Sequence, residues 1–446
     1  MLAPVCLLGG SLSSRLFNRL AAPIWLSRAR RTIRPLRIEQ TELKDLLPIA
    51  DALATVIRHA PRLPVVSMAL NAAGGRTLAC RLVADCDQPP FDRSAMDGIA
   101  TRAADTHPGA RLRIIGVAAA GVPFTSTIPV GACVRIFTGA VVPGDADTVV
   151  PVERINVDNE VASLSASVPV GQHIARQGCE TRQGAAIVEA GELLTATRLA
   201  VAATFGHAQI QVTRAPRVAI LPTGDELVDV SAIPGPGQIR DSNRYALAQI
   251  FRQGGAEVVD MPAATDDATA LHASLCSALR AADVVVTCGG VSAGDLDLVA
   301  PALSELGANI LFHKIRIKPG KPLLFATLGE KVVLGLPGNP VSAAVCALLF
   351  GLPLLAAMQG RSSASWQIVR LPLAQGLPAV GARDEIVPLF VTSLADRMAV
   401  SPIATVGSAD IFAFSRAQLL GMRPAGQAPL APGDALDVFL WPTLQP

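Results

Sequence analysis

Three glycine-rich loops in the second half of the chain carry residues that could bind a phosphorylated ligand. In such loops glycine lets backbone N–H groups approach an anion, and the N-terminus of a following helix adds positive potential. Any one of them alone could be an ordinary tight turn, and none matches a Walker A loop or a G-x-G-x-x-G fingerprint. The three loops are TGDEL (223–227), GGVSAGDLD (289–297) and GLPGNPVS (335–342).

Carboxylates accompany these loops at Glu226, Asp266 and Asp297. In an open α/β sheet, ligands bind beyond the carboxyl ends of the strands, and all three residues are expected at that edge. Carboxylates beside phosphate-binding loops are suitable ligands for a Mg²⁺ ion that is bridged to a phosphorylated substrate. The sequence therefore predicts a Mg²⁺ site beside an anion site.

A cluster of lysines follows. The chain has 38 basic residues but only five are Lys, and three of these, Lys314, Lys318 and Lys321, fall within eight residues. If residues 314–318 form a strand, alternation places Lys314, Arg316 and Lys318 on one face. Three cations on one face predict that a phosphate or another oxyanion binds there. A solvated edge strand that uses lysines against aggregation is the alternative.

The elements that must position these residues alternate between strand and helix from residue 217 to residue 358. Apolar strands between helices indicate a wound, mostly parallel sheet, so the fold class is multidomain α/β plus β. A helix at 41–59, a strand and helix at 63–82, an all-β region at about 110–215 and a small C-terminal β-barrel at 362–446 complete the prediction. In the α/β region, strands are expected at 217–221, 256–261, 283–288, 311–317, 323–326 and 332–336, and helices at 242–253, 267–281, 296–306 and 340–358.

One segment is apolar enough to be considered as a membrane span. Residues 332–360 contain no charge, and the part after Pro340 has about 18 apolar residues, the lower limit for a span. Because prolines interrupt the segment, a buried helix that begins after a Pro-Gly-Asn-Pro turn is the favoured interpretation.

Composition excludes several classes of protein. Half of the 446 residues are hydrophobic and 17% are charged, which excludes intrinsic disorder. A net charge of +2 gives no sign of a nucleic-acid-binding surface.

Residues 1–38 hold seven Arg and no acid, a composition that fits a mitochondrial presequence, an extension upstream of the true start or a disordered arm. Eight Cys without a C-x-x-C or zinc spacing indicate a reduced compartment.

Seven motifs together resemble the molybdopterin molybdenumtransferase family, whose eukaryotic relatives include the gephyrin-type proteins. They occur in the family's order across about 37–446, and only the C-terminal region matches weakly, through residues 381–385 and 407–408. The motifs are PPFDRSAMDG (89–98), RIFTGA (135–140), TGDEL (223–227), GQIRDSNR (237–244), GGVSAGDLD (289–297), KIRIKPGKP (314–322) and GLPGNPVSA (335–343).

The resemblance implies an enzyme of molybdenum cofactor biosynthesis. It implies that adenylylated molybdopterin is hydrolysed and molybdate is inserted with the help of Mg²⁺, releasing AMP. It also implies a cytoplasmic homodimer whose sites join one subunit's α/β domain to the partner's N-terminal domain. Molybdopterin adenylyltransferase would act upstream and a molybdoenzyme or its chaperone downstream, with no nucleic acid and no membrane involved.

The domain boundaries implied by the resemblance divide the chain into five parts. They are a basic N-terminal extension (1–38), a discontinuous N-terminal domain (39–64 and 185–215), an inserted β-rich domain (65–184), a molybdopterin-binding α/β domain (216–361) and a C-terminal β-barrel domain (362–446).

The family's site residues carry over to matching positions of this sequence. The catalytic set is Asp97, Thr138, Glu226, Asp266, Asp297, Lys314 and Lys318, of which Glu226, Asp266 and Asp297 are the metal ligands. The binding set is Thr223, Gly224, Gly289, Gly290, Ser292, Gly294, Lys321, Pro337, Gly338, Asn339, Pro340, Ser342, Arg383 and Ser408. Molybdate itself is expected to contact Lys318, Lys321, Ser342, Arg383 and Ser408.

Four positions depart from the family pattern: Arg93, Ile99, Cys179 and Leu298. Arg93 adds a cation near the expected substrate edge. The departures favour one alternative, a non-catalytic chaperone that binds molybdopterin or the finished cofactor. A scaffold of the gephyrin type is a further alternative, although the sequence supplies no receptor-peptide groove for it. The sequence does not distinguish molybdate from tungstate and does not assign a general base.

Overall fold

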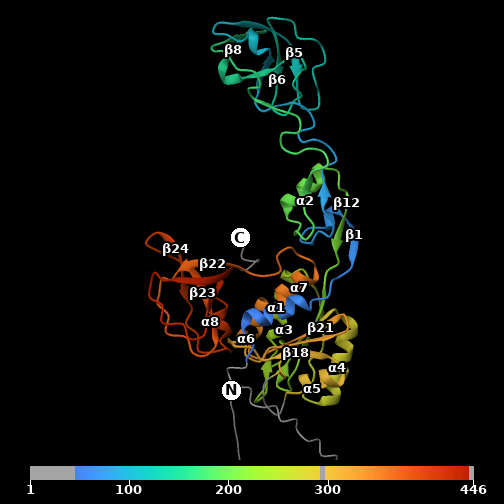
Figure 1. Cartoon of the computed structure of the whole chain (residues 1–446), viewed down its shortest axis with the longest axis vertical. Coiled ribbons are helices and arrows are strands. Elements are labelled where there is room, and N and C mark those ends of the chain that lie inside the picture. Colours follow the sequence, from blue (N-terminus) through green and yellow to red (C-terminus); the bar gives the residue numbers. More distant parts are fainter. Residues whose placement is uncertain (1–45, 292–296, 441–446) are drawn as a thin grey trace, which may run out of the picture. The chain divides into compact units, whose positions relative to one another are not determined.

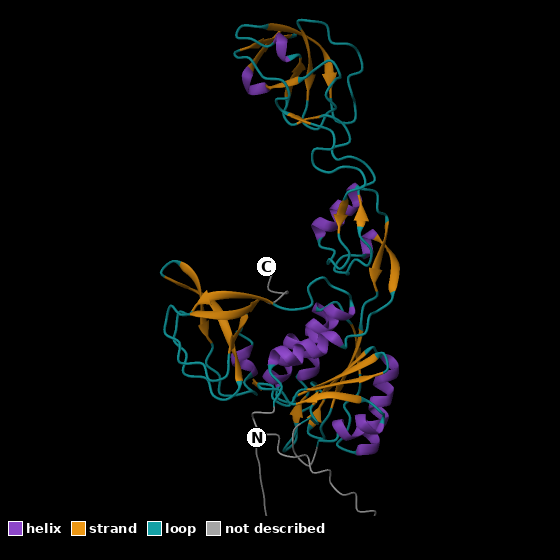
Figure 2. Ribbon diagram, in the orientation of Figure 1, coloured by secondary structure: helices purple, strands orange, loops and turns teal. Residues whose placement is uncertain are grey.

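The computed structural model describes residues 46–291 and 297–440 (Figure 1, Figure 2). Its α/β domain contains a six-stranded sheet in the order β16-β13-β17-β21-β20-β18. The first four strands are parallel to one another, and β20 runs antiparallel to both of its neighbours. The strands are β13 (Arg217–Pro222), β16 (Glu257–Asp260), β17 (Val284–Cys288), β18 (Asn309–His313), β20 (Leu324–Leu328) and β21 (Lys331–Leu336).

Helices cover both faces of this sheet (Figure 1). Along β13, Val218 and Ile220 pack with α3, α6 and α7, while Ala219 and Leu221 pack with α4 and α5. Burial on both faces explains why the strands are continuously apolar. The helices are α3 (Asn243–Gln253), α4 (Ala268–Ala281), α5 (Val299–Glu305), α6 (Pro340–Cys346) and α7 (Leu352–Met358).

The apolar segment that begins at Pro340 is a core helix. α6 continues through a π-helical segment (Ala347–Gly351) into α7, and the three together span Pro340–Met358. The helix meets the length and hydropathy of a membrane span, but 94% of its most apolar window is buried inside the protein. This confirms the prediction of a buried helix.

The first described helix, α1 (Ile49–Arg58), also belongs to the core of the α/β domain. It is shorter than the helix expected at 41–59, and residues 41–45 lie outside the described part of the chain. Its apolar residues Ile49, Leu53 and Val56 are buried in the same cluster as Leu355 and Met358 of α7. These contacts differ from the expected grouping of 39–64 with 185–215, because the apolar stripe of an amphipathic helix packs on the nearest apolar surface.

Two groups of strands precede the α/β domain. In the first, β1 (Val65–Ala69) pairs with β12 (Gln209–Thr213), and β2 (Leu82–Val83) pairs with β11 (Ala186–Val188). The expected boundary at residue 65 therefore separates a strand from its partner, and the domain boundaries stay predictions. The second group is a six-stranded sheet ordered β7-β4-β6-β5-β9-β8, made of β4 (Gly98–Thr101), β5 (Arg111–Ala118), β6 (Ala132–Ile136), β7 (Thr148–Pro151), β8 (Ile155–Asp158) and β9 (Val161–Leu164).

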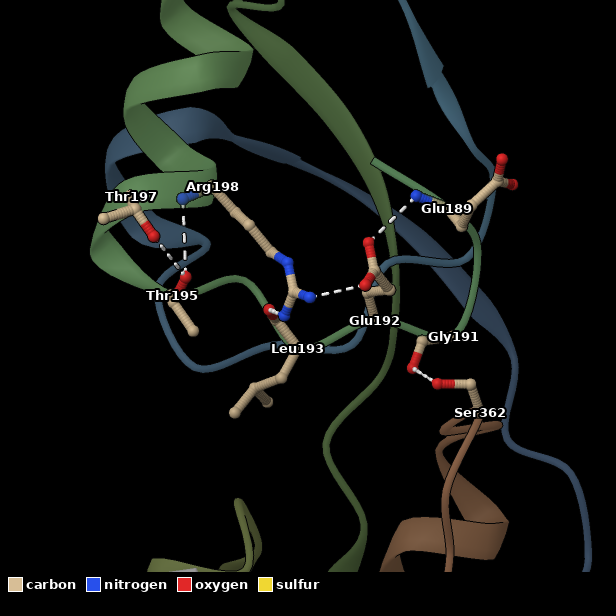
Figure 3. A network of polar contacts seen from close by, with 8 residues as sticks. All are labelled: Glu189, Gly191, Glu192, Leu193, Thr195, Thr197, Arg198 and Ser362. Atoms are coloured by element: carbon tan, nitrogen blue, oxygen red, sulfur yellow. Dashed lines mark hydrogen bonds and ion pairs between the residues drawn. The ribbon is translucent and has the colours of Figure 1, made fainter. Parts of the chain in front are cut away.

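The region expected to be all-β contains one α-helix, α2 (Ala196–Thr204). The Thr195 hydroxyl caps it by accepting a hydrogen bond from the Arg198 N–H at 3.4 Å, and the Arg198 guanidinium pairs with Glu192 (Figure 3). Nearby, the Ser362 hydroxyl donates to the Gly191 carbonyl at 3.5 Å. A cap residue followed by helix-forming residues, in the sequence T-A-T-R-L-A, was the signal that could have predicted this helix.

The C-terminal region forms a sheet with the path β19-β23-β25-β26-β22, and β24 pairs with β23. A closed barrel is not confirmed, since a single bridge between Leu373 and Val400 joins β24 to the end of β22. The elements are β19 (Ile317–Lys318), β22 (Gln367–Pro372), β23 (Asp384–Leu394), β24 (Arg397–Pro402), α8 (Ile411–Phe414), β25 (Leu419–Arg423) and β26 (Ala435–Leu440). The remaining short strands of the described residues are β3 (Arg93–Ser94), β10 (Ile174–Ala175), β14 (Leu227–Val228) and β15 (Ile239–Arg240).

Candidate functional site

The loops after β13, β17 and β21 surround a cavity of about 730 Å³. The strand register brings them together, because Pro222 pairs with Cys288 and Cys288 pairs with Leu336. Gly289 has φ of 100°, and a Cβ there would lie 2.6 Å from the Thr223 carbonyl oxygen, so the loops can approach only with glycine at this position. The cavity lining includes the expected binding residues Thr223, Gly224, Gly289, Gly290, Pro337, Gly338, Asn339 and Pro340.

The three expected metal ligands, Glu226, Asp266 and Asp297, line this larger cavity. The Asp266 N–H donates to the Asp225 carboxylate at 3.1 Å, which ties the loop after β16 to the loop after β13. Within residues 46–291 and 297–440, no three His, Cys, Asp or Glu side chains converge closely enough to hold a metal ion by themselves. A Mg²⁺ ion here would need further oxygens from its substrate, which is the usual way that proteins bind Mg²⁺ with phosphates.

Asp297 is the best placed of the three to meet a cation. Its side chain is only 5% exposed, and one carboxylate oxygen lies 3.4 Å from Nε2 of His313. Neither oxygen makes a hydrogen bond of regular geometry with another described residue. Burial raises the pKa of Asp297, and His313, the Ala300 and Val299 backbone N–H groups and the Lys314 charge oppose the shift. A buried carboxylate without full hydrogen bonding is stabilised when a cation binds it.

A smaller cavity of about 360 Å³ adjoins the larger one, since Pro322, Pro337 and Asn339 line both. Asn339 donates to the Ser408 hydroxyl at 2.9 Å, and the Val341 N–H donates to the Ser408 carbonyl at 3.1 Å. These bonds hold the C-terminal region against the loop after β21. All five residues expected to contact molybdate line this cavity: Lys318, Lys321, Ser342, Arg383 and Ser408.

The lysine cluster is built differently from the expectation. The strand expected at 311–317 is interrupted, because β18 ends at His313 and Lys314 has φ of 86°. Lys314, Arg316 and Lys318 therefore do not alternate along one strand face, and Lys314 lines neither cavity.

The partners of two of these cations are carboxylates of the same chain. β19 runs parallel to β23, with Ile317 opposite Asp384 and Lys318 opposite Glu385. Lys318 donates to Glu385 at 3.0 Å, and Arg316 lies 3.5 Å from Asp384. The repulsion expected between the cations is thus relieved without a bound anion.

Asp97 and Thr138 form a preorganised pair in the N-terminal half. Both the N–H and the hydroxyl of Thr138 donate to one Asp97 oxygen, at 2.7 and 2.8 Å, and these bonds lower the pKa of Asp97. The pair forms because Asp97 precedes β4 and Thr138 follows β6 at neighbouring ends of paired strands. Neither residue lines the two cavities.

The structure adds residues that the sequence did not assign. Asn243 lines the larger cavity and donates to the Gly338 carbonyl at 2.7 Å, which fixes the loop after β21. Glu385 lines the smaller cavity, and His313 faces Asp297. Asn243 and Glu385 lie inside matched motifs, at 237–244 and 381–385, so their place in the motif was the available signal. The expected binding residues Ser292 and Gly294 lie outside the described residues.

The departures at positions 93 and 99 have local explanations. Arg93 pairs with Glu180 at 2.9 Å, so its charge is matched within its own domain and is not a free cation at a substrate edge. Ile99 is buried in β4, where an aliphatic side chain packs without needing a polar partner. Cys179 is exposed, and Leu298 packs against the apolar cluster under α4 and α5.

Comparison with known proteins agrees with this architecture. Residues 47–206 match the family model described as the MoeA N-terminal region (domain I and II), and residues 219–357 match the model of a probable molybdopterin binding domain. A crystal structure of a molybdopterin biosynthesis moeA protein from Pyrococcus horikoshii superposes with a TM-score of 0.77 at 25% identity, covering 89% of this chain and 100% of that one.

Curated relatives carry one activity name. The molybdopterin molybdenumtransferase of a Nostoc species is 37% identical over 308 residues, which cover 67% of this chain and 70% of the relative. The molybdopterin molybdenumtransferase of Staphylococcus aureus is 28% identical over 404 residues, covering 90% of this chain and 96% of the relative. With both domain models, the motif order and the fold in agreement, the chain belongs to the molybdopterin molybdenumtransferase family, the enzymes of molybdenum cofactor biosynthesis.

Proposed function

We propose that the protein catalyses the Mg²⁺-dependent insertion of molybdate into adenylylated molybdopterin in the cytoplasm and releases AMP. The observation that supports this most strongly is the pair of adjoining cavities. The larger one has glycine loops and carboxylates, the smaller one has three cations, and the two share Pro322, Pro337 and Asn339. A phosphorylated ligand and an oxyanion would therefore lie next to each other.

In the larger cavity, backbone N–H groups of the loops after β13 and β17 would bind the phosphoanhydride. Asp297, with Glu226 and Asp266 on the same lining, would hold Mg²⁺ together with phosphate oxygens. When bound, Mg²⁺ would neutralise the negative charge that develops on the phosphates and on the leaving AMP. Addition of water across the phosphoanhydride would give AMP and molybdopterin phosphate.

In the smaller cavity, Lys318, Lys321 and Arg383 would attract molybdate, and the hydroxyls of Ser342 and Ser408 would donate to its oxygens. Asn339 orients the Ser408 hydroxyl from the wall shared with the larger cavity. This arrangement would hold molybdate close to the dithiolene of a substrate in the larger cavity. Close positioning of two reactants is itself a large contribution to catalysis.

Asp97 and Thr138 enter the proposal through a second subunit. They line neither cavity of their own chain, but their preorganised pair presents one carboxylate in a fixed orientation. We propose a homodimer in which this pair completes the partner's site. Substrate would come from a molybdopterin adenylyltransferase, and product would go to a molybdoenzyme or its chaperone.

Release of AMP tests the proposed reaction. Purified protein with adenylylated molybdopterin, molybdate and Mg²⁺ should release AMP, and Asp297→Asn should slow the release by at least about 100-fold. Asp158→Asn, on an exposed strand position, is the matched control and should behave like the wild type. Tight binding of the substrate with an intact anhydride would instead indicate a cofactor-binding chaperone.

A further inference from the structure

Glu385 contributes a negative charge to a cavity that is otherwise positive. It is the one carboxylate among the described residues that line the smaller cavity, beside Lys318, Lys321 and Arg383. One of its oxygens accepts a hydrogen bond from Lys318 Nζ at 3.0 Å, and the other lies 3.7 Å from an Arg423 nitrogen. A carboxylate in an oxyanion cavity needs an explanation, because it repels the ligand.

The Glu385 carboxylate lies beside Arg423, a buried arginine whose position is fixed by hydrogen bonds. The Arg423 side chain is fully buried at 0% exposure. It donates to the Pro378 and Ala428 carbonyls at 2.6 and 3.1 Å and to the Gln427 side chain at 2.9 Å. The Lys318 side chain, in contrast, is 59% exposed. An arriving anion can therefore draw Lys318 toward itself, while the Glu385 carboxylate stays in the lining.

The side chains that line the smaller cavity set its formal charge. Three cations and one carboxylate give the lining itself a formal charge of +2, and the buried Arg423 adds a cation behind Glu385 that does not line the cavity. The neighbouring cavity is the proposed site of a phosphoanhydride, which carries more negative charge in one place. Placing a like charge against the wrong ligand is a general way to obtain specificity.

We propose that Glu385 is a specificity-determining residue that makes the smaller cavity select a dianionic oxyanion over polyphosphate. This inference rests on the proposed function, because it takes the smaller cavity as the molybdate site. Without the carboxylate the lining would be more positive, and affinity for the more highly charged ligand would rise most.

The experiment measures binding of radiolabelled molybdate to the full-length protein and its displacement by pyrophosphate at fixed ionic strength without Mg²⁺. The wild type should prefer molybdate. Glu385→Gln keeps the size and one acceptor of the side chain, and should lower the ratio of the pyrophosphate to the molybdate dissociation constant by about tenfold. Asp437→Asn, in an exposed pair with Arg370 on the same sheet, is the matched control and should leave the ratio unchanged.

Two further variants separate charge from structure. Glu385→Asp keeps the charge and should keep the wild-type ratio even if binding weakens. Combining Lys318→Gln with Glu385→Gln returns the formal charge of the lining to +2. This double variant should restore the wild-type ratio of the two dissociation constants. An unchanged ratio in Glu385→Gln, or the same shift in Glu385→Asp, overturns the inference. Failure of the wild type to bind molybdate rejects the oxyanion cavity itself, and with it the proposed function.

Discussion

At the residue scale, the buried carboxylate of Asp297 belongs to the proposed Mg²⁺ site and is expected to lower the stability of the fold at neutral pH. Burial raises its pKa, so the fold disfavours the charged form, which a bound cation would stabilise. Asp297→Asn should therefore raise the melting temperature at neutral pH by about 2 °C while it slows the proposed AMP release. Differential scanning calorimetry across pH checks the sign. The gain should shrink as pH falls through the raised pKa, and a lower melting temperature at pH 7 would contradict it.

The sequence predicted best which residues would line one cavity, while their roles stay predictions. The glycine loops and their carboxylates follow strands, so strand order alone brings Glu226, Asp266 and Asp297 to one cavity. The partners of the lysines could not be predicted in the same way. Lys318 meets Glu385 only because β19 pairs with β23, a contact between segments 67 residues apart that no local pattern encodes.

At the scale of elements, an ion pair connects the segments that lead into β13 and β17 of the α/β sheet. Arg214 donates twice to Asp283 at 2.9 and 3.0 Å, and the Arg217 N–H donates to the same carboxylate at 2.8 Å. Burial alone would raise the pKa of Asp283, but these bonds outweigh it and the pKa is lowered. A lowered pKa means that the stabilisation is present above the ordinary Asp pKa and is lost as pH falls through the folded-state value.

Asp283→Asn tests this element. At pH 7 it should lower the free energy of unfolding by about 1–3 kcal/mol, since it removes charge-assisted hydrogen bonds from a partly buried pair. Chemical denaturation of wild type and variant should show this difference in full at pH 7 and a smaller one below about pH 4. Asp437→Asn, from an exposed pair, should have little effect at either pH. A difference that stays constant with pH would refute the account.

The turn that carries Lys318 and Lys321 depends on a glycine. Gly320 has φ of 111°, and a Cβ there would lie 2.6 Å from Cys346 Sγ in α6. Gly320→Ala should weaken molybdate binding at least about tenfold, because the turn must shift away from the helix. Gly307→Ala has a comparable positive φ with open space around it, and is the control for backbone strain alone. Equal effects of the two variants on molybdate affinity would contradict this prediction.

Hydrophobic periodicity and turn residues predicted most elements of the α/β domain, but one failure inside that domain and one before it are instructive. One strand was predicted at 311–317, whereas the left-handed conformation at Lys314 divides this segment and β19 pairs with the C-terminal sheet. The helix α2 was missed because short Val and Ile runs around it favoured strands. Both errors arise where tertiary pairing or a single capping residue, Thr195, outweighs the local average.

For the whole molecule, the proposed dimer makes a quantitative prediction. Neither Asp97→Asn nor Asp297→Asn subunits should be active alone, because each lacks one part of every site. Mixed dimers would contain one intact site, so random exchange of equal amounts should restore about a quarter of wild-type AMP release. Co-expression with two different tags and purification of the mixed species checks this. Activity that stays at background in verified mixed dimers would show that Asp97 and Asp297 act in one subunit's site or in separate steps.

The most direct test of the account follows AMP and molybdenum together in one turnover. Protein in excess over adenylylated molybdopterin is incubated with Mg²⁺, with or without molybdate, and free AMP and pterin-bound molybdenum are measured in the same sample. The account predicts that, with molybdate present, AMP is released and an equal amount of molybdenum becomes bound to the pterin. An intact phosphoanhydride, or AMP release without any molybdenum on the pterin, under conditions where a family relative succeeds, would contradict it.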